Sequence, residues 1–159
     1  MLSTASLVSR VIATLVICAA LADSANAGPP DDACSLLTPA QVSAGLGVPV
    51  GAGAYITPTF KKTCTWNATT NGGGTVTLNL QSLDQYEGGR KLAAYGNSVS
   101  TTSIGGIGDD AYYFGTTKLV SLIVKKGNVA FKLAVYAPIP IERQQAAEKA
   151  LALQIVSQL

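Results

Sequence analysis

Apolar and polar residues alternate along parts of this chain, and the alternation predicts half-buried β-strands. In residues 74–82, GTVTLNLQS, a valine and two leucines occupy one face, and the threonines, Asn79 and Gln81 occupy the other. That second face is expected to be either solvent-exposed or covered by a helix. Residues 128–137, NVAFKLAVYA, alternate in the same way. The middle of residues 118–127, KLVSLIVKKG, is apolar on both faces, as in a central strand.

Turn-forming residues join the predicted strands into hairpins. The tip of one hairpin is Gly127-Asn128, between the two strands just described. Residues 67–74, NATTNGGG, form the loop of another hairpin, which pairs a strand at residues 63–68 with the strand at residues 74–82. A further strand, AYYFG, is expected at residues 111–115. These hairpins predict an antiparallel sheet.

Three segments carry helix signals. Thr38–Gln41, TPAQ, has the spacing of a capping box with proline at the first helical position, and Gly47 is placed to end this helix. Residues 82–96 predict a second helix. A break at Gly88-Gly89 stays open, because each glycine costs about 1 kcal/mol relative to alanine. Residues 139–159 predict an amphipathic third helix, because Ala147, Leu151, Ile155 and Leu159 recur at every fourth position.

Strands joined by hairpins, with helices near both ends, are typical of an α+β fold built on an antiparallel sheet. The chain shows no internal repeat and no linker. We therefore expect a single domain over residues 28–159, which is long enough to bury a core of its own. Residues 1–27 have a different pattern, which points to export.

The N-terminal segment has the three-part pattern of a secretory signal peptide. Arg10 supplies positive charge, Val11–Ala22 is an uncharged apolar run, and Ala25-Asn26-Ala27 has the small residues that a signal peptidase needs. The run is shorter than the ~20 residues of a permanent membrane span. We expect cleavage after Ala27 and a mature chain that is periplasmic or extracellular, without a transmembrane span. Lipid attachment at Cys18, which follows LVI, is an alternative.

Two cysteines lie outside the predicted signal peptide, Cys34 and Cys64. An exported chain meets an oxidising environment, so an even pair of cysteines predicts a disulfide. A redox-active pair is the alternative, although such pairs favour a C-x-x-C spacing. Because the chain has no histidine, two cysteines make a zinc site improbable. We therefore expect no bound metal and no cofactor.

The charge distribution argues against nucleic acid as a partner. Lys and Arg number 11 and Asp and Glu number 9, a net charge of +2. Neighbouring basic residues form isolated pairs, Lys61-Lys62 and Lys125-Lys126, instead of the continuous basic patch that is typical of nucleic-acid binding. We expect a protein or small-molecule partner instead.

The stretch SIGGIGDDAYYFG, residues 103–115, combines glycines with two carboxylates and two tyrosines. A glycine-rich loop cradles phosphate between a strand and a helix, but here a strand follows the glycines. Adjacent carboxylates on a strand point to opposite faces, which disfavours a calcium site. The stretch is best explained as a turn before a strand. Asp109, Asp110 and Tyr112 form the candidate recognition surface.

Several catalytic groups are missing from the sequence. It has no histidine, no G-x-S-x-G elbow and no S-x-x-K motif, and serine without a base rarely performs acyl transfer. We expect a non-catalytic module that binds a small ligand or a protein, with no catalytic residues. Two alternatives stay open: a histidine-free hydrolase that uses Asp109 or Asp110, and a structural or assembly accessory protein.

Four motifs in order resemble a family of exported bacterial domains of unknown function, which is common among actinobacterial envelope lipoproteins. They are DACSLLTPAQVSAGLGVPV from Asp32, CTW from Cys64, GIGDDAYY from Gly106 and L-x-V-x-K-G from Leu122, followed by an amphipathic helix. The resemblance implies an α+β sandwich similar to the PsbP and Mog1 proteins and a Cys34–Cys64 bridge. It implies no catalytic residues. The chain departs from the lipoprotein members because it lacks a convincing lipid-acceptor cysteine.

The signal-peptide hypothesis predicts the mass of the exported protein. The chain should begin at Gly28 and carry no lipid, which intact-mass spectrometry of protein recovered from the envelope or medium will measure. A diacylglyceryl group at Cys18 would contradict this expectation.

Overall fold

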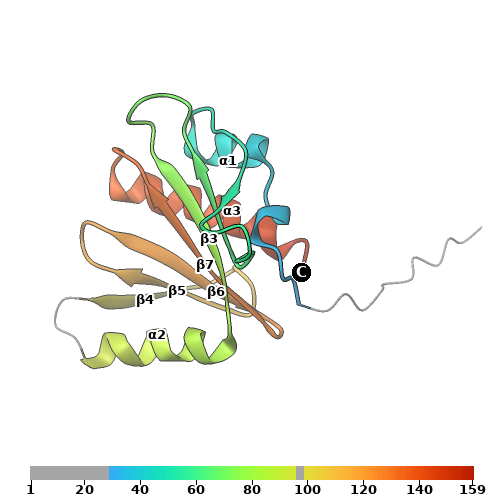
Figure 1. The fold of residues 1–159 in the computed structure, drawn as a ribbon. Coiled ribbons are helices and arrows are strands. Elements are labelled where there is room, and N and C mark those ends of the chain that lie inside the picture. Colours follow the sequence, from blue (N-terminus) through green and yellow to red (C-terminus); the bar gives the residue numbers. More distant parts are fainter. Residues whose placement is uncertain (1–28, 96–98) are drawn as a thin grey trace, which may run out of the picture.

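The computed structural model of this protein describes residues 29–95 and 99–159 (Figure 1). The predicted signal peptide, its cleavage after Ala27 and the alternative lipid site at Cys18 lie outside the described residues. The elements in chain order are η1 (Ala33–Ser35), α1 (Pro39–Leu46), β1 (Ala54–Tyr55), β2 (Thr63–Asn67), β3 (Thr75–Gln81), α2 (Leu83–Tyr95), β4 (Ser100–Ile104), β5 (Asp110–Gly115), β6 (Val120–Lys126), β7 (Val129–Tyr136) and α3 (Ile141–Val156).

The strands form one open antiparallel sheet of seven, in the order β1-β2-β3-β7-β6-β5-β4. The predicted α+β fold on an antiparallel sheet is therefore confirmed, with helices near both ends of the described chain. Both predicted hairpins are present, since β2 pairs with β3 and β6 pairs with β7. The edge strands β1 and β4 were not expected from the alternation.

Local side-chain caps begin α1, as predicted, and also α2. At α1, the Gln41 backbone N–H donates to Thr38 Oγ1 over 3.3 Å, and the Thr38 N–H donates to Gln41 Oε1 over 2.7 Å. The same reciprocal pair joins Ser82 and Gln85 at the start of α2. Gly47 ends α1 with φ 80°, in the left-handed region that glycine tolerates best.

One face of the sheet packs against α1 and α3, and the main hydrophobic core lies between them. Alternate strand residues point into this core, among them Leu78, Leu122 and Phe131, all completely buried. Leu151 and Ile155 of α3 meet them from the helix side. The predicted apolar stripe of α3 thus faces the sheet as far as Ile155, whereas Leu159 lies beyond the helix and is exposed.

Helix α2 covers part of the opposite face (Figure 1), where it contacts β4, β5, β6 and β7. A second, smaller hydrophobic core lies between α2 and the sheet and contains Tyr86, Tyr112, Ile123 and Ala130. The helix runs unbroken through Gly88 and Gly89, so the open possibility of a break there is resolved.

The predicted disulfide joins Cys34 of η1 to Cys64 of β2, across 30 residues of sequence. A backbone hydrogen bond of 2.8 Å from Ala33 N–H to the Lys61 carbonyl lies beside it. Together they fasten the segment before α1 to the sheet.

Glu148 is an ionisable side chain sealed inside the main core. It lies on α3 and is completely buried, and its Oε1 accepts the Val135 backbone N–H over 3.0 Å. Strand β6 pairs with β7 only as far as Leu133, so Glu148 replaces a strand partner at Val135. Its Oε2 is buried without a hydrogen-bond partner among the described residues. Burial raises the pKa of Glu148 to about 8, and burial with Glu148 nearby raises the pKa of Tyr113 to about 12.

Removal of the disulfide should destabilise the domain. For a closed loop of 30 residues, the chain-entropy model gives about 3–4 kcal/mol as an upper value. We expect Cys34→Ser to lower the free energy of unfolding by up to that amount under oxidising conditions, measured by denaturant titration. The reduced parent protein is the control and should match the variant. Equal stability of variant and oxidised parent would show that the bridge is not formed in solution.

Glu148 should make the domain less stable as pH rises. The folded-state pKa of Glu148 is about 8, above its ordinary value of 4.5, so the folded state holds a proton that the unfolded state releases between these values. The free energy of unfolding should therefore fall from about pH 4.5 to about pH 8, by at most about 1.4 kcal/mol per pH unit. Denaturant titrations from pH 5.5 to 8 will measure this slope.

Glu148→Gln should flatten the slope, because the amide does not titrate but still offers an oxygen to the Val135 N–H. Glu142→Gln, an exposed change on the same helix, is the matched control and should keep the slope. An unchanged slope in Glu148→Gln would contradict the assignment.

Candidate functional site

Asp109 lies in the turn before β5 and fastens that turn to the β6–β7 hairpin. Its carboxylate accepts the Gly127 backbone N–H over 2.6 Å and the Lys126 Nζ over 3.1 Å. These two donors, the Gly127 N–H first, lower the pKa of Asp109. Gly106 and Gly108 have φ of 80° and 60°, as a turn predicts, whereas Gly105 has no positive φ.

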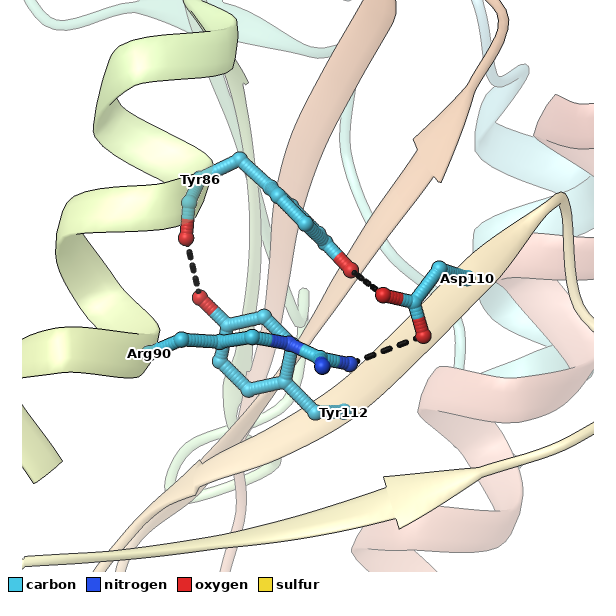
Figure 2. Close-up of polar contacts among 4 residues, drawn as sticks. All are labelled: Tyr86, Arg90, Asp110 and Tyr112. Carbon is cyan, nitrogen blue, oxygen red and sulfur yellow. Dashed lines mark hydrogen bonds and ion pairs between the residues drawn. The ribbon is translucent and has the colours of Figure 1, made fainter. Parts of the chain in front are cut away.

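Asp110 points to the other side, toward α2 (Figure 2). One carboxylate oxygen accepts the Tyr86 hydroxyl over 2.6 Å, and the other accepts Arg90 Nη2 over 2.8 Å. Tyr112 donates its hydroxyl to the Tyr86 carbonyl over 2.7 Å and is completely buried. We call these four residues, Tyr86, Arg90, Asp110 and Tyr112, the α2 anchor.

Aromatic and cationic groups pack closely inside the α2 anchor. The guanidinium carbon of Arg90 lies 4.9 Å from the ring centroid of Tyr112, and the rings of Tyr86 and Tyr112 meet edge to face at 5.3 Å. Such contacts add stability beyond buried area. The anchor thus combines a half-exposed ion pair with a buried aromatic pair.

The chemistry of the α2 anchor suits a structural role. Burial, followed by the hydrogen bond to Asp110, raises the pKa of Tyr86, and burial also raises the pKa of Tyr112. Both phenols therefore stay protonated near neutral pH and serve as hydrogen-bond donors instead of bases. Of the three residues in the predicted recognition surface, Asp110 and Tyr112 hold α2 to the sheet, and Asp109 fastens a turn.

A second candidate site lies where α2 does not reach. On the same face, β2, β3 and the adjoining part of β7 present polar side chains in register. Thr65, Thr77 and Ala134 form one rung, and the next consists of Thr63, Asn79 and Lys132. The polar face predicted for β3 is therefore half-buried and lies outside the contact with α2, and its neighbours extend it across three strands.

A cavity of about 280 Å³ lies on this face, and one of about 430 Å³ lies beside it at the ends of β3 and β7; both are lined by Asn79 and Gln81. We call them together the open-face groove. Its lining residues are Pro29, Pro30, Ile56, Phe60, Lys62, Thr63, Thr77, Asn79, Leu80, Gln81, Ser82, Gln85, Asn128, Val129, Ala130, Lys132, Ala134 and Tyr136.

The groove has a polar floor and an apolar rim. On the floor, Asn79 Nδ2 donates to Thr63 Oγ1 over 2.6 Å, while Gln81 Oε1 is buried without a hydrogen-bond partner among the described residues. On the rim, Ile56 and Phe60 are 68% and 49% exposed, and Tyr136 is 40% exposed. A polar floor between exposed apolar side chains is suited to hold a ligand that has both polar and apolar surfaces.

Comparisons of the chain with models of known protein families, with curated proteins and with solved structures give no match. Within residues 29–95 and 99–159, no three His, Cys, Asp or Glu side chains gather as a metal site would require. No helix in this part of the chain has the length and apolar character to cross a membrane. The fold and the groove define a single-domain α+β protein with one partly uncovered sheet face.

The two neighbouring glycines of α2 should respond to alanine in opposite directions. A Cβ at Gly89 would lie 2.6 Å from the Tyr112 hydroxyl oxygen, which cannot move without losing its bond to the Tyr86 carbonyl. A Cβ at Gly88 would meet nothing within 4 Å. We expect Gly88→Ala to raise the free energy of unfolding by about 1 kcal/mol.

Gly89→Ala should lower the free energy of unfolding by about 1–2 kcal/mol, because overpacking costs about 1–3 kcal/mol and helix propensity offsets part of it. Denaturant titration of the two variants will give the sign of each change. Stabilisation by both substitutions would show that α2 does not rest on Tyr112 as described.

Proposed function

We propose that this protein is an exported, non-catalytic bacterial envelope protein that binds its ligand in the open-face groove. The observation that carries the proposal is the groove itself. Three adjacent strands expose a polar floor there, and the linings of its two cavities share Asn79 and Gln81. Concave sites with a few placed polar groups are the usual form of a ligand site.

Export is supported by two independent features of the chain. The N-terminal sequence has the pattern of a signal peptide, and the Cys34–Cys64 disulfide is consistent with an oxidising compartment. The family resemblance carried by the four motifs remains part of the proposal, as does the PsbP- and Mog1-like sandwich. Helices on both faces of an antiparallel sheet agree with that architecture.

Asp109, Asp110 and Glu148 give little support to a hydrolase. A general acid needs a raised pKa and access to substrate. The pKa of Asp109 is lowered instead, by Gly127 and Lys126. Asp110 is engaged by Tyr86 and Arg90, and Glu148, whose pKa is raised, is sealed from solvent. These contacts favour binding over catalysis.

An accessory role in assembly would need a continuous apolar surface. Outside the groove, large exposed apolar side chains include Leu92, Leu119 and Leu153. They belong to α2, to the segment before β6 and to α3, which places Leu92 and Leu153 on opposite sides of the sheet. The groove is the stronger candidate for a contact surface.

The proposal can be tested by mapping where natural ligands bind. Isotope-labelled protein, residues 28–159, is titrated with small-molecule and oligosaccharide fractions of a bacterial envelope extract, and amide chemical shifts are followed by NMR. We expect shifts to gather at the residues of β2, β3 and β7 that line the groove. Shifts confined to another surface, or no shifts with any fraction, would contradict the proposal.

A matched pair of variants strengthens this test. Thr77→Trp fills the floor of the groove and should abolish the shifts, whereas Thr101→Trp places the same side chain on an exposed position of β4 and should preserve them. The amide spectra of both variants will show whether the fold is intact.

A further inference from the structure

The charges that line the open-face groove have one sign. Lys132 lies on the floor and Lys62 at one end, and no Asp or Glu is among the described lining residues. Neither lysine forms an ion pair within the described chain, where the pairs found are Arg90–Asp110 and Lys126–Asp109. A concave surface lined by one sign of charge concentrates ligands of the opposite sign. The groove therefore favours a ligand with negative charge.

Within the described residues, no negative charge on the other face of the sheet compensates the positive charge of Lys132. Glu148 interacts with Lys132 electrostatically, but burial holds the pKa of this carboxyl at about 8. Glu148 is thus mostly protonated near neutral pH and does not neutralise the lysine. The positive charge on the groove floor is available to a bound group.

The hydrogen-bonding groups on the groove floor need a ligand that donates hydrogen bonds as well as carrying negative charge. Gln81 Oε1 is buried and unpartnered among the described residues, and an amide oxygen can only accept a hydrogen bond. A bare carboxylate accepts hydrogen bonds only and has no donor to offer it. Thr77 and the Thr63–Asn79 pair add groups that both donate and accept. A ligand with many hydroxyl groups supplies both functions along the groove.

The shape of the groove fits an extended ligand with flat apolar surfaces. From Thr75 to Gln81 the open strand spans about 20 Å, at roughly 3.3 Å per residue. Phe60 lines one cavity and Tyr136 the other, and both rings are partly exposed. Exposed rings offer apolar faces that can stack on the C–H faces of sugar rings.

A peptide strand is a poorer fit to this surface. Peptides that add to a sheet pair their backbone with a free edge. At the groove, however, β3 is already paired on both sides, with β2 and with β7. A peptide on this face would leave its own backbone groups without the ladder that normally supplies affinity.

We infer that the open-face groove binds an acidic oligosaccharide, a chain of sugar units that carries carboxylate groups. This inference rests on the proposed function and deepens it by naming the ligand class. Lys132 contacts a carboxylate, Gln81 and Thr77 contact hydroxyls, and Phe60 and Tyr136 pack against sugar rings near the two ends.

Three matched probes separate charge from hydroxyl groups. Tetragalacturonate has both, its methyl ester keeps the hydroxyls without the charge, and tetraglutamate keeps the charge without the hydroxyls. We expect calorimetry and NMR on residues 28–159 to show tetragalacturonate bound in the groove, roughly tenfold more tightly than either of the others, since a hydrogen bond to a charged group contributes about a factor of ten or more. The affinity should weaken as salt is raised.

Variants of two lysines provide the matched control. Lys132→Gln should weaken tetragalacturonate binding roughly tenfold and leave binding of the methyl ester unchanged. Lys149→Gln makes the same change in charge on the exposed side of α3, at the opposite face of the sheet, and should change neither affinity. Amide spectra establish that both variants fold.

Each unfavourable outcome has a distinct meaning. Equal binding of the methyl ester would overturn the role of charge, and equal binding of tetraglutamate would overturn the role of hydroxyls, so either result overturns the inference. If tetragalacturonate does not bind while envelope fractions still shift groove residues, the inference on ligand class fails and the proposed function stands. If no fraction shifts groove residues either, the proposed function fails as well.

Discussion

The need to cover both faces of a single sheet governs this structure. The first face of the seven-stranded sheet has α1 and α3, which enclose the main core. The second face has α2 alone, which lies over the half formed by β4 to β7. In the described chain, no helix covers the other half, over β2 and β3. The groove forms there because the second face has only this one helix.

The α2 anchor sets the boundary between the covered and the open half. Asp110 binds Tyr86 and Arg90 at once, and the Tyr112 hydroxyl holds the Tyr86 carbonyl. Gly89 allows the helix backbone to approach Tyr112 closely. Because these contacts fix α2 over β5 and β6, the start of α2 forms one end wall of the groove through Ser82 and Gln85. Asp110 and Tyr112, two residues of the predicted recognition surface, therefore help to position one end of the groove.

The predictions from sequence succeeded for elements that are set by contacts between residues close together in the chain. The capping box of α1 and the alternation of β3 involve neighbours within a few residues, and both are confirmed. Strand β4, with the sequence STTSI, escaped prediction because an edge strand with exposed polar side chains on both faces has no alternation to detect. The possible break of α2 at Gly88-Gly89 rested on intrinsic propensity, which the packing of Tyr86 against the sheet overrides.

The sequence by itself determined the strands of the central sheet, the helix caps, the paired cysteines and the shortage of catalytic groups, because each depends on residue type and near-neighbour spacing. Only the tertiary structure decided which half of the second face α2 covers and which polar residues share a rung. Lys132 lies beside Asn79 and Arg90 meets Asp110 through pairings that join distant parts of the chain. The physical reason is that strand register and helix docking are set by burial over the whole sheet, and no local pattern encodes them.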